Sequence, residues 1–179
     1  MRRLCNLKKV VWQYSCSDSS TDEPATSTEM ELFEGKPLLG PDGNEIDAQS
    51  ALKGKMIALY FSAMWCPSCR QFTPKLARFY KEIKEAGKNF EIVLVSRDRE
   101  DEDLKEYLTE HCGGWLAIPF GDSRIQEFLA KYEVPTIPAL RVLKSDGSVL
   151  IADARNQVTE KGRDDPLQLY QEWETELAK

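Results

Sequence analysis

The chain has 179 residues, 5 cysteines, 1 histidine and a formal net charge of −6, which together exclude several classes of protein. Its length predicts one domain, and the 41% of hydrophobic residues is typical of a globular protein. The longest apolar run, Met56–Phe61, is much shorter than the roughly 18 residues of a membrane-spanning helix. The acidic balance argues against a nucleic-acid partner, which favours a basic surface.

The cysteine pattern favours a reducing compartment. Small secreted scaffolds carry a dense, even set of cysteines, whereas this chain has an odd number and only Cys66 and Cys69 are closely spaced. We therefore expect a cytoplasmic protein, with the nucleus as a further location.

Residues 1–30 form an N-terminal extension that we expect to be flexible, followed by a globular domain over residues 31–179. The start of the extension is basic and free of acidic residues, and residues 15–30 are rich in Ser and Thr without apolar periodicity. Two interpretations stay open for this extension: a disordered tail, or a mitochondrial transit peptide. A mitochondrial location follows only from the second.

The first half of the globular region predicts strands on either side of a long helix. Residues 36–39 form a short expected strand before a turn rich in Gly and Pro. The continuous apolar runs at 56–61 and 91–95 are typical of buried parallel strands. Between these runs, apolar residues recur at helical spacing and predict a helix over residues 67–86 that ends at Gly87.

Two further helices follow the second apolar run. The first is lined by three side chains at helical spacing, Leu104, Tyr107 and Leu108. We expect His111 and Cys112 to lie at the end of this helix. Adjacent side chains on a helix diverge, so these two residues are not expected to form a catalytic Cys–His pair. The next helix opens at Ser123, which forms a predicted capping box with Gln126.

The last elements are a hairpin and a closing helix. Asp146-Gly147 is a hairpin turn between expected strands at 140–143 and 149–151. The closing helix starts at Asp165 as its N-cap, followed by a proline at the first helical position. Its inward stripe consists of Leu169, Tyr170, Trp173 and Leu177. The alternation of strands and helices predicts an α/β fold with helices on both faces of an open sheet.

The segment from Trp65 to Arg70 reads Trp-Cys-Pro-Ser-Cys-Arg and lies between a buried strand and the start of the long helix. The free N–H groups and the positive end of the helix macrodipole favour a thiolate at Cys66. Pro67 suits the first helical position, since its missing N–H has no partner there. One helical turn brings Cys69 close enough to break a mixed disulfide formed by Cys66. We therefore predict Cys66 as the nucleophile and Cys69 as the resolving thiol.

A zinc site is the alternative for the same C-x-x-C spacing. Tetrahedral zinc needs a second pair of ligands, which could come only from His111, Cys112, Cys5 and Cys16. None of these residues forms another C-x-x-C pair. The order of strand, C-x-x-C and helix therefore favours redox chemistry, with no metal ion at the cysteines.

Four sequence motifs lie in a fixed order along the domain. They are Ala63–Arg70 with the two cysteines, the flanking residues between Tyr60 and Tyr80, Trp115–Phe120, and Ile137–Leu140. Together these motifs resemble the thioredoxin superfamily, and within it the branch of the tryparedoxins and nucleoredoxins. The resemblance spans about residues 31–179, nearly the whole globular region.

The resemblance implies a thioredoxin fold, with a central mixed β-sheet flanked by helices on both faces. It implies a thiol–disulfide oxidoreductase that reduces protein disulfides through Cys66 and Cys69. The expected partners are disulfide-containing protein substrates and an electron donor, either a reductase or a small dithiol. We expect a monomer without a cofactor. The alternative function is a redox-sensitive protein-binding regulator of nucleoredoxin type, in which cysteine oxidation switches affinity for a partner.

The resemblance also implies a substrate-binding surface beside the sulfurs. Its residues are Trp65, Pro67, Ile137 and Pro138. The Ile137-Pro138 peptide bond is expected to be cis, so that the backbone of Ile137 faces an extended substrate strand.

Three positions distinguish this chain from patterns in the superfamily. Ser68 stands where the branch usually has a second proline, and Ala139 replaces the threonine after the cis-proline. Tyr60 lies six residues before Cys66, at the position where ordinary thioredoxins have a buried aspartate. The carboxylate relay of those proteins is therefore missing, and the sequence does not identify a replacement.

Overall fold

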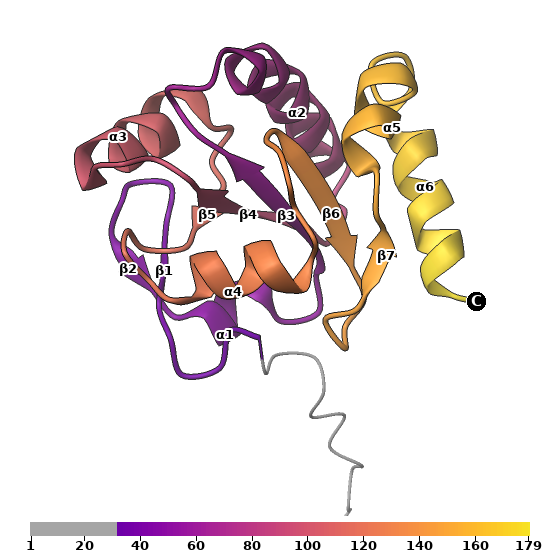
Figure 1. The fold of residues 1–179 in the computed structure, drawn as a ribbon. Helices are drawn as coiled ribbons and strands as arrows, with labels where there is room; N and C mark the ends of the chain where they lie inside the picture. The colour runs from indigo at the N-terminus through magenta and orange to yellow at the C-terminus, as the bar shows by residue number, and fades with distance from the viewer. Residues whose placement is uncertain (1–31) are drawn as a thin grey trace, which may run out of the picture.

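The computed structural model describes residues 32–179, which form a seven-stranded sheet with helices on both faces (Figure 1). The strand order is β2-β1-β5-β4-β3-β6-β7. The extension predicted over residues 1–30 lies outside the described residues. Within residues 32–179, no helix has the length and apolar character needed to cross a membrane.

The bounds of the elements follow the chain. The strands are β1 (Leu38–Leu39), β2 (Glu45–Ile46), β3 (Met56–Ser62), β4 (Phe90–Ser96), β5 (Leu116–Ala117), β6 (Ala139–Leu143) and β7 (Val149–Ile151). The helices are α1 (Ala48–Leu52), α2 (Pro67–Glu85), α3 (Asp101–Glu106), α4 (Arg124–Lys131), α5 (Ala154–Glu160) and α6 (Pro166–Leu177). A π-helical turn, η1 (Tyr107–His111), directly continues α3.

The centre of the sheet is built from β3 and β4, which run parallel in register from Met56↔Phe90 to Ser62↔Ser96. Strand β6 pairs antiparallel on the other side of β3, which makes the sheet mixed, as predicted. Both central strands are buried along their whole length. Burial on both faces explains why their sequences read as continuous apolar runs rather than alternating patterns.

Each face of the sheet contributes to its own hydrophobic core. Ala58 and Tyr60 of β3 face a core shared with α2, α3, α5 and α6. Their neighbours Ile57, Leu59 and Phe61 point to the opposite face and pack with α1 and α4. This period of two is the normal alternation of side chains along a strand.

Two predicted details of the helices are wrong. Ser123 makes no side-chain cap hydrogen bond, because its backbone is already helical (φ −58°, ψ −28°). The first helical N–H, that of Arg124, instead donates to the carboxylate of Asp122 at 2.8 Å. In α6 the predicted cap Asp165 is present and accepts from Gln168 N, but Leu177 in the last turn is 42% exposed rather than inward-facing.

Candidate active site

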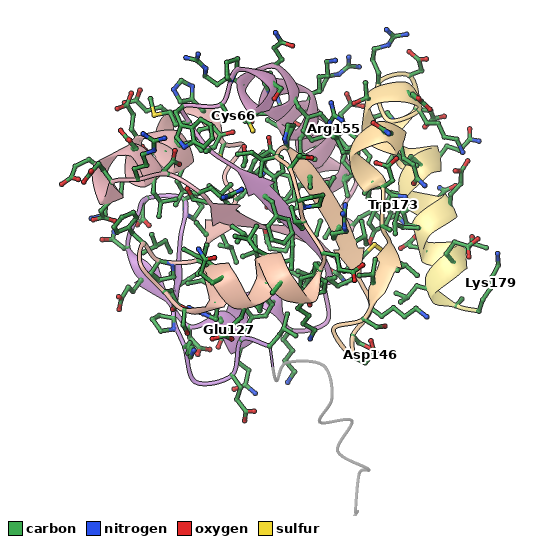
Figure 2. The ribbon with its side chains drawn as sticks, in the orientation of Figure 1. Cys66, Glu127, Asp146, Arg155, Trp173 and Lys179 are labelled. Carbon is green, nitrogen blue, oxygen red and sulfur yellow. The ribbon has the colours of Figure 1, made fainter. Side chains whose placement is uncertain are left out.

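The two cysteines lie where the loop after β3 leads into α2, at one end of the sheet. Figure 2 shows Cys66 at this end and Asp146, in the β6–β7 turn, at the opposite end. Cys66 is the N-cap of α2, with extended backbone angles (φ −87°, ψ 115°), and its sulfur accepts the backbone N–H of Cys69 at 3.4 Å. Pro67 follows at the first helical position, where a missing N–H costs nothing.

The two sulfur atoms are in direct contact. The thiol of Cys69 donates a hydrogen bond to the sulfur of Cys66, with the two Sγ atoms 2.6 Å apart. The Ser68 hydroxyl lies 3.3 Å from the same Cys66 sulfur. Cys66 is 5% exposed and Cys69 is completely buried. Both cysteines are therefore buried, and Cys66 is the one that keeps a small exposed area while Cys69 lies directly behind it.

The pKa values of the two thiols shift in opposite directions. Burial opposes ionisation of Cys66, but hydrogen bonds from the Cys69 thiol and the Ser68 hydroxyl outweigh it and lower its pKa. Burial, together with the hydrogen bond to Cys66, raises the pKa of Cys69 to about 12. Cys66 is therefore the sulfur that ionises first, which is the property required of an attacking thiolate.

The loop that precedes Cys66 is attached to the loop that follows β4. The indole Nε1 of Trp65 donates to the carbonyl of Arg97 at 3.1 Å, and the backbone N–H of Met64 donates to Asp98 Oδ1 at 2.7 Å. The guanidinium of Arg99 lies over the Trp65 ring, 5.8 Å from its centroid. The ring of Trp65 is nevertheless 50% exposed. A large apolar side chain thus stays accessible beside the reactive sulfur.

The peptide bond between Ile137 and Pro138 is cis, which confirms the expectation from the resemblance. It lies directly before β6, the antiparallel neighbour of β3. Ile137 packs against the small cluster of Ala63, Cys66 and Cys69. The structure therefore brings residues 66, 69 and 137 together, although about 70 residues separate them in the chain.

The sequence did not single out the buried hydroxyl groups behind Cys69. At the position of the aspartate of ordinary thioredoxins, the Tyr60 hydroxyl forms a hydrogen bond with Thr73 at 2.9 Å. The hydroxyls of Ser62 and Tyr107 lie in the same cluster. Tyr60 was the one available signal, because its place in the motif marked a missing carboxylate.

In the described part of the chain, the side chains that could share a metal ion do not include Cys66 or Cys69. Among residues 32–179, the group of His, Cys, Asp and Glu side chains close enough to share an ion is Glu106, Glu110 and His111, and all three are exposed. Cys112 is half-buried, and burial raises the pKa of its thiol. Neither Cys112 nor His111 joins Cys66 and Cys69 in a four-ligand arrangement within this part of the chain.

A dithiol at the start of a helix, beside a cis-proline on a mixed α/β sheet, is the arrangement of a thioredoxin-like protein. The chain belongs to the thioredoxin-like family, which matches residues 54–149. Thioredoxin from Wuchereria bancrofti aligns with a TM-score of 0.65 and 45% sequence identity, covering 78% of this chain and 94% of that protein.

Further relatives place the chain in the branch of the tryparedoxins and nucleoredoxins. Tryparedoxin I from Crithidia fasciculata aligns with a TM-score of 0.69 and 34% identity, covering 79% of this chain and 96% of that protein. Human nucleoredoxin is 42% identical over 123 residues, which are 68% of this chain. Probable nucleoredoxin 1 of Arabidopsis thaliana is 43% identical over 127 residues, or 71% of this chain. The chain spans only 28% and 22% of the length of these two nucleoredoxins.

Proposed function

We propose that the chain is a thiol–disulfide oxidoreductase that reduces protein disulfides through Cys66 and Cys69. One observation carries the proposal: the Cys66 sulfur, with a lowered pKa, lies 2.6 Å from the more deeply buried Cys69 sulfur, with a raised pKa. The first property suits an attacking thiolate, and the second suits a thiol that stays protonated until a mixed disulfide has formed.

The reaction has two exchange steps. The Cys66 thiolate attacks one sulfur of the substrate disulfide, forms a mixed disulfide and releases the other substrate sulfur as a thiolate. Cys69 then attacks the Cys66 sulfur, the Cys66–substrate bond breaks, and the second substrate sulfur leaves with the proton of Cys69. The chain is now oxidised by two electrons and the substrate is reduced by two. A reductase or a small dithiol returns the chain to the dithiol state.

The substrate would bind over the surface between Trp65 and the cis-proline. The exposed indole of Trp65 offers apolar contact area on one side of Cys66. Ile137 packs against the cysteines on the other side, where its backbone can pair with an extended substrate strand. Pro67 and Pro138 complete this surface. We further propose a monomer that works in the reducing environment of the cytoplasm or nucleus.

The direct test is catalysed reduction of insulin disulfides by limiting dithiothreitol. Wild-type protein is expected to accelerate the reduction, and Cys66→Ser to remove the acceleration completely, since no other thiol occupies its place at the start of α2. Cys112→Ser is the matched control and is expected to keep the activity. Activity that survives in Cys66→Ser contradicts the proposal.

The alternative function predicts a different outcome. A redox-sensitive binding regulator would co-purify with a stable partner, and the partner would stay bound when both Cys66 and Cys69 are replaced by serine. If the wild-type protein does not reduce insulin and such a partner is found, the result would favour the binding regulator over the reductase.

A further inference from the structure

Four hydroxyl groups form a continuous buried chain behind the active-site dithiol. We call Ser62, Tyr107, Thr73 and Tyr60 the hydroxyl chain; they come from β3, η1 and α2. Ser62 Oγ lies 2.7 Å from Tyr107 Oη, Tyr107 Oη lies 2.5 Å from Thr73 Oγ1, and Thr73 Oγ1 lies 2.9 Å from Tyr60 Oη. All four residues are at most 1% exposed. The chain is therefore shielded from water and must satisfy its own hydrogen bonds.

The hydroxyl chain approaches Cys69 at two points. Ser62 directly precedes Ala63, which packs against Cys69, and the Ser62 hydroxyl acts in the direction that lowers the pKa of the Cys69 thiol. In the structure this hydroxyl is hydrogen-bonded to Tyr107 and not to the Cys69 sulfur. At the other point, Thr73 Oγ1 donates to the backbone carbonyl of Cys69 at 2.9 Å. Cys69 is thus enclosed by the hydroxyl chain on its inner side and by Cys66 on its outer side.

Counting protons shows that the hydroxyl chain has two arrangements. Each hydroxyl carries one proton. When Thr73 donates to the Cys69 carbonyl, both tyrosines must donate to Thr73, and Ser62 must then donate to Tyr107. If the hydroxyl of Thr73 turns toward Tyr107 instead, Tyr107 is free to donate to Ser62. Ser62 can then donate to the Cys69 sulfur. Every hydrogen bond within the hydroxyl chain is kept, and only the bond from Thr73 to the Cys69 carbonyl is lost.

The second step of the exchange requires this second arrangement. Before the reaction, Cys69 donates its proton to the Cys66 sulfur. In the mixed disulfide Cys66 is no longer a thiolate, so Cys69 loses this partner at the moment when it must itself become negative. A buried thiolate without a hydrogen-bond donor is costly. Ser62 supplies a donor at that sulfur without bringing a permanent charge into the core.

The hydroxyl chain is not the base that takes the proton. Burial raises the pKa of Tyr107 to about 12 and also raises the pKa of Tyr60, so both hydroxyls stay protonated at neutral pH. The proton of Cys69 passes to the departing substrate sulfur, as in the balanced exchange above. The chain contributes oriented dipoles, in the manner of an oxyanion hole.

We propose that the hydroxyl chain stabilises the thiolate of Cys69 while it attacks the mixed disulfide, with Ser62 as the hydroxyl that turns from Tyr107 to donate to the reacting sulfur. This inference rests on the proposed exchange through Cys66 and Cys69. It assigns Ser62 as a catalytic residue and Tyr107 as a positioning residue that polarises the Ser62 hydroxyl.

In the full-length reduced protein, the exchange steps at Cys66 and Cys69 can be measured separately with a substrate that releases one chromophore in each step. One equivalent of dithiobis(nitrobenzoate), an aromatic disulfide, loses one coloured thiolate when Cys66 attacks and the second when Cys69 attacks. With this substrate the proton of Cys69 passes to solvent, because the aromatic thiolate stays ionised at neutral pH. Ser62→Ala is expected to leave the first release unchanged within about twofold and to slow the second by roughly tenfold, because a hydrogen bond to a charged atom is lost. Tyr107→Phe is expected to slow the second release less, by about threefold. Ser62 can still donate to the Cys69 sulfur, but it loses the Tyr107 hydroxyl that polarises it.

The pH profile of the second release distinguishes this role from a structural one. Its midpoint is expected to move upward in Ser62→Ala and to return in Ser62→Thr, which restores the hydroxyl. Other titratable groups near the chain are Cys66 on α2, His111 on η1, whose ring centroid is 6.2 Å from that of Tyr107, and Cys112 and Asp98 beyond it. His111→Asn serves as the control for this side of Tyr107 and is expected to keep the wild-type midpoint.

Tyr132→Phe is the matched control for loss of a buried tyrosine hydroxyl, since Tyr132 Oη bonds to Gly147 O on the other face of the sheet. A wild-type second release and midpoint in both Ser62→Ala and Tyr107→Phe would overturn the inference, and Tyr107→Phe alone decides if Ser62→Ala does not fold. A wild-type protein that releases only one chromophore would instead overturn the proposed function itself.

Discussion

The two ends of the central sheet each bury a polar cluster, and the clusters differ in charge. At the amino ends of β3 and β4, the carboxylate of Glu91 is met by Lys55 Nζ at 2.9 Å and by the Tyr80 hydroxyl at 2.7 Å. At the carboxyl ends, the groups around Cys69 are the neutral hydroxyls that include Ser62 and Tyr107. Glu91 is only 4% exposed and Ser62 and Tyr107 are at most 1% exposed, whereas the Lys55 side chain stays 27% exposed.

The difference reflects how long each charge exists. The Glu91 carboxylate is paired with the lysines Lys55 and Lys84, because an unpaired buried charge costs several kcal/mol. In the proposed exchange, Cys69 is charged only while it attacks the mixed disulfide. A fixed cation would keep that sulfur ionised, whereas hydroxyls that can turn support a thiolate when it forms and a thiol when it does not.

The largest expected effect comes from removing the Cys69 thiol. Cys69→Ser is expected to lower turnover by at least about a hundredfold, because the mixed disulfide at Cys66 has no internal thiol to break it. Mass spectrometry of the intact protein after mixing with a substrate disulfide is expected to show a trapped covalent adduct. Turnover equal to wild type, with no adduct, would mean that the second sulfur plays no part.

Removing the Glu91 carboxylate should affect stability and not activity. Glu91→Gln is expected to lower the free energy of unfolding by about 2 kcal/mol, because Lys55 loses its partner in a partly buried position. Urea denaturation measures this change, and insulin reduction by the folded protein is expected to stay at the wild-type rate. Glu85→Gln is the matched control: its pair with Lys81 is exposed and worth less than about 0.5 kcal/mol. If the two variants lower the free energy of unfolding equally, the buried pair stabilises the fold no more than an exposed pair.

The smallest expected effect is at the outer sulfur. Ser68→Ala removes one of the hydrogen bonds that lower the pKa of Cys66, so its pKa should rise and its thiolate fraction at neutral pH should fall. We expect the rate of alkylation by iodoacetamide at neutral pH to fall by about threefold, and the midpoint of the pH profile to move upward. The exposed position of Ser68 makes a change in stability unexpected. An unchanged midpoint would assign the low pKa to the helix and to Cys69 alone.

The sequence predicted the long elements closely because their patterns have clear physical causes. The helix predicted over 67–86 is observed as Pro67–Glu85, and the strand predicted over 91–95 as Phe90–Ser96. Proline at the start and glycine after the end mark the helix, and burial on both faces produces the apolar run of the strand.

Short elements escaped prediction because they carry too few residues for a period. Strands β2 and β5 have two residues each, and α1 has five. Helix α5 also went unpredicted, since only Ala154 and Val158 of its residues are buried. Tertiary packing rather than local sequence determines these segments.

The site was predictable in part for a similar reason. Cys66 and Cys69 form a compact motif, and the cis bond before Pro138 followed from the resemblance. The hydroxyl chain has no motif, because 45 residues separate Ser62 from Tyr107 and local sequence does not mark which hydroxyl groups are buried. At helical spacing, Tyr107 is indistinguishable from an ordinary core residue.

The bonds that attach Trp65 and Met64 to the loop after β4 involve neither sulfur. We therefore expect this part of the surroundings of the dithiol to keep its position when the two sulfurs are oxidised. A protein that touches Trp65 would then meet the same surface before and after the reaction. Departure of the product would then depend on the loss of a covalent bond rather than on a change of shape, and each cycle leaves two electrons and the protons of the dithiol to be restored.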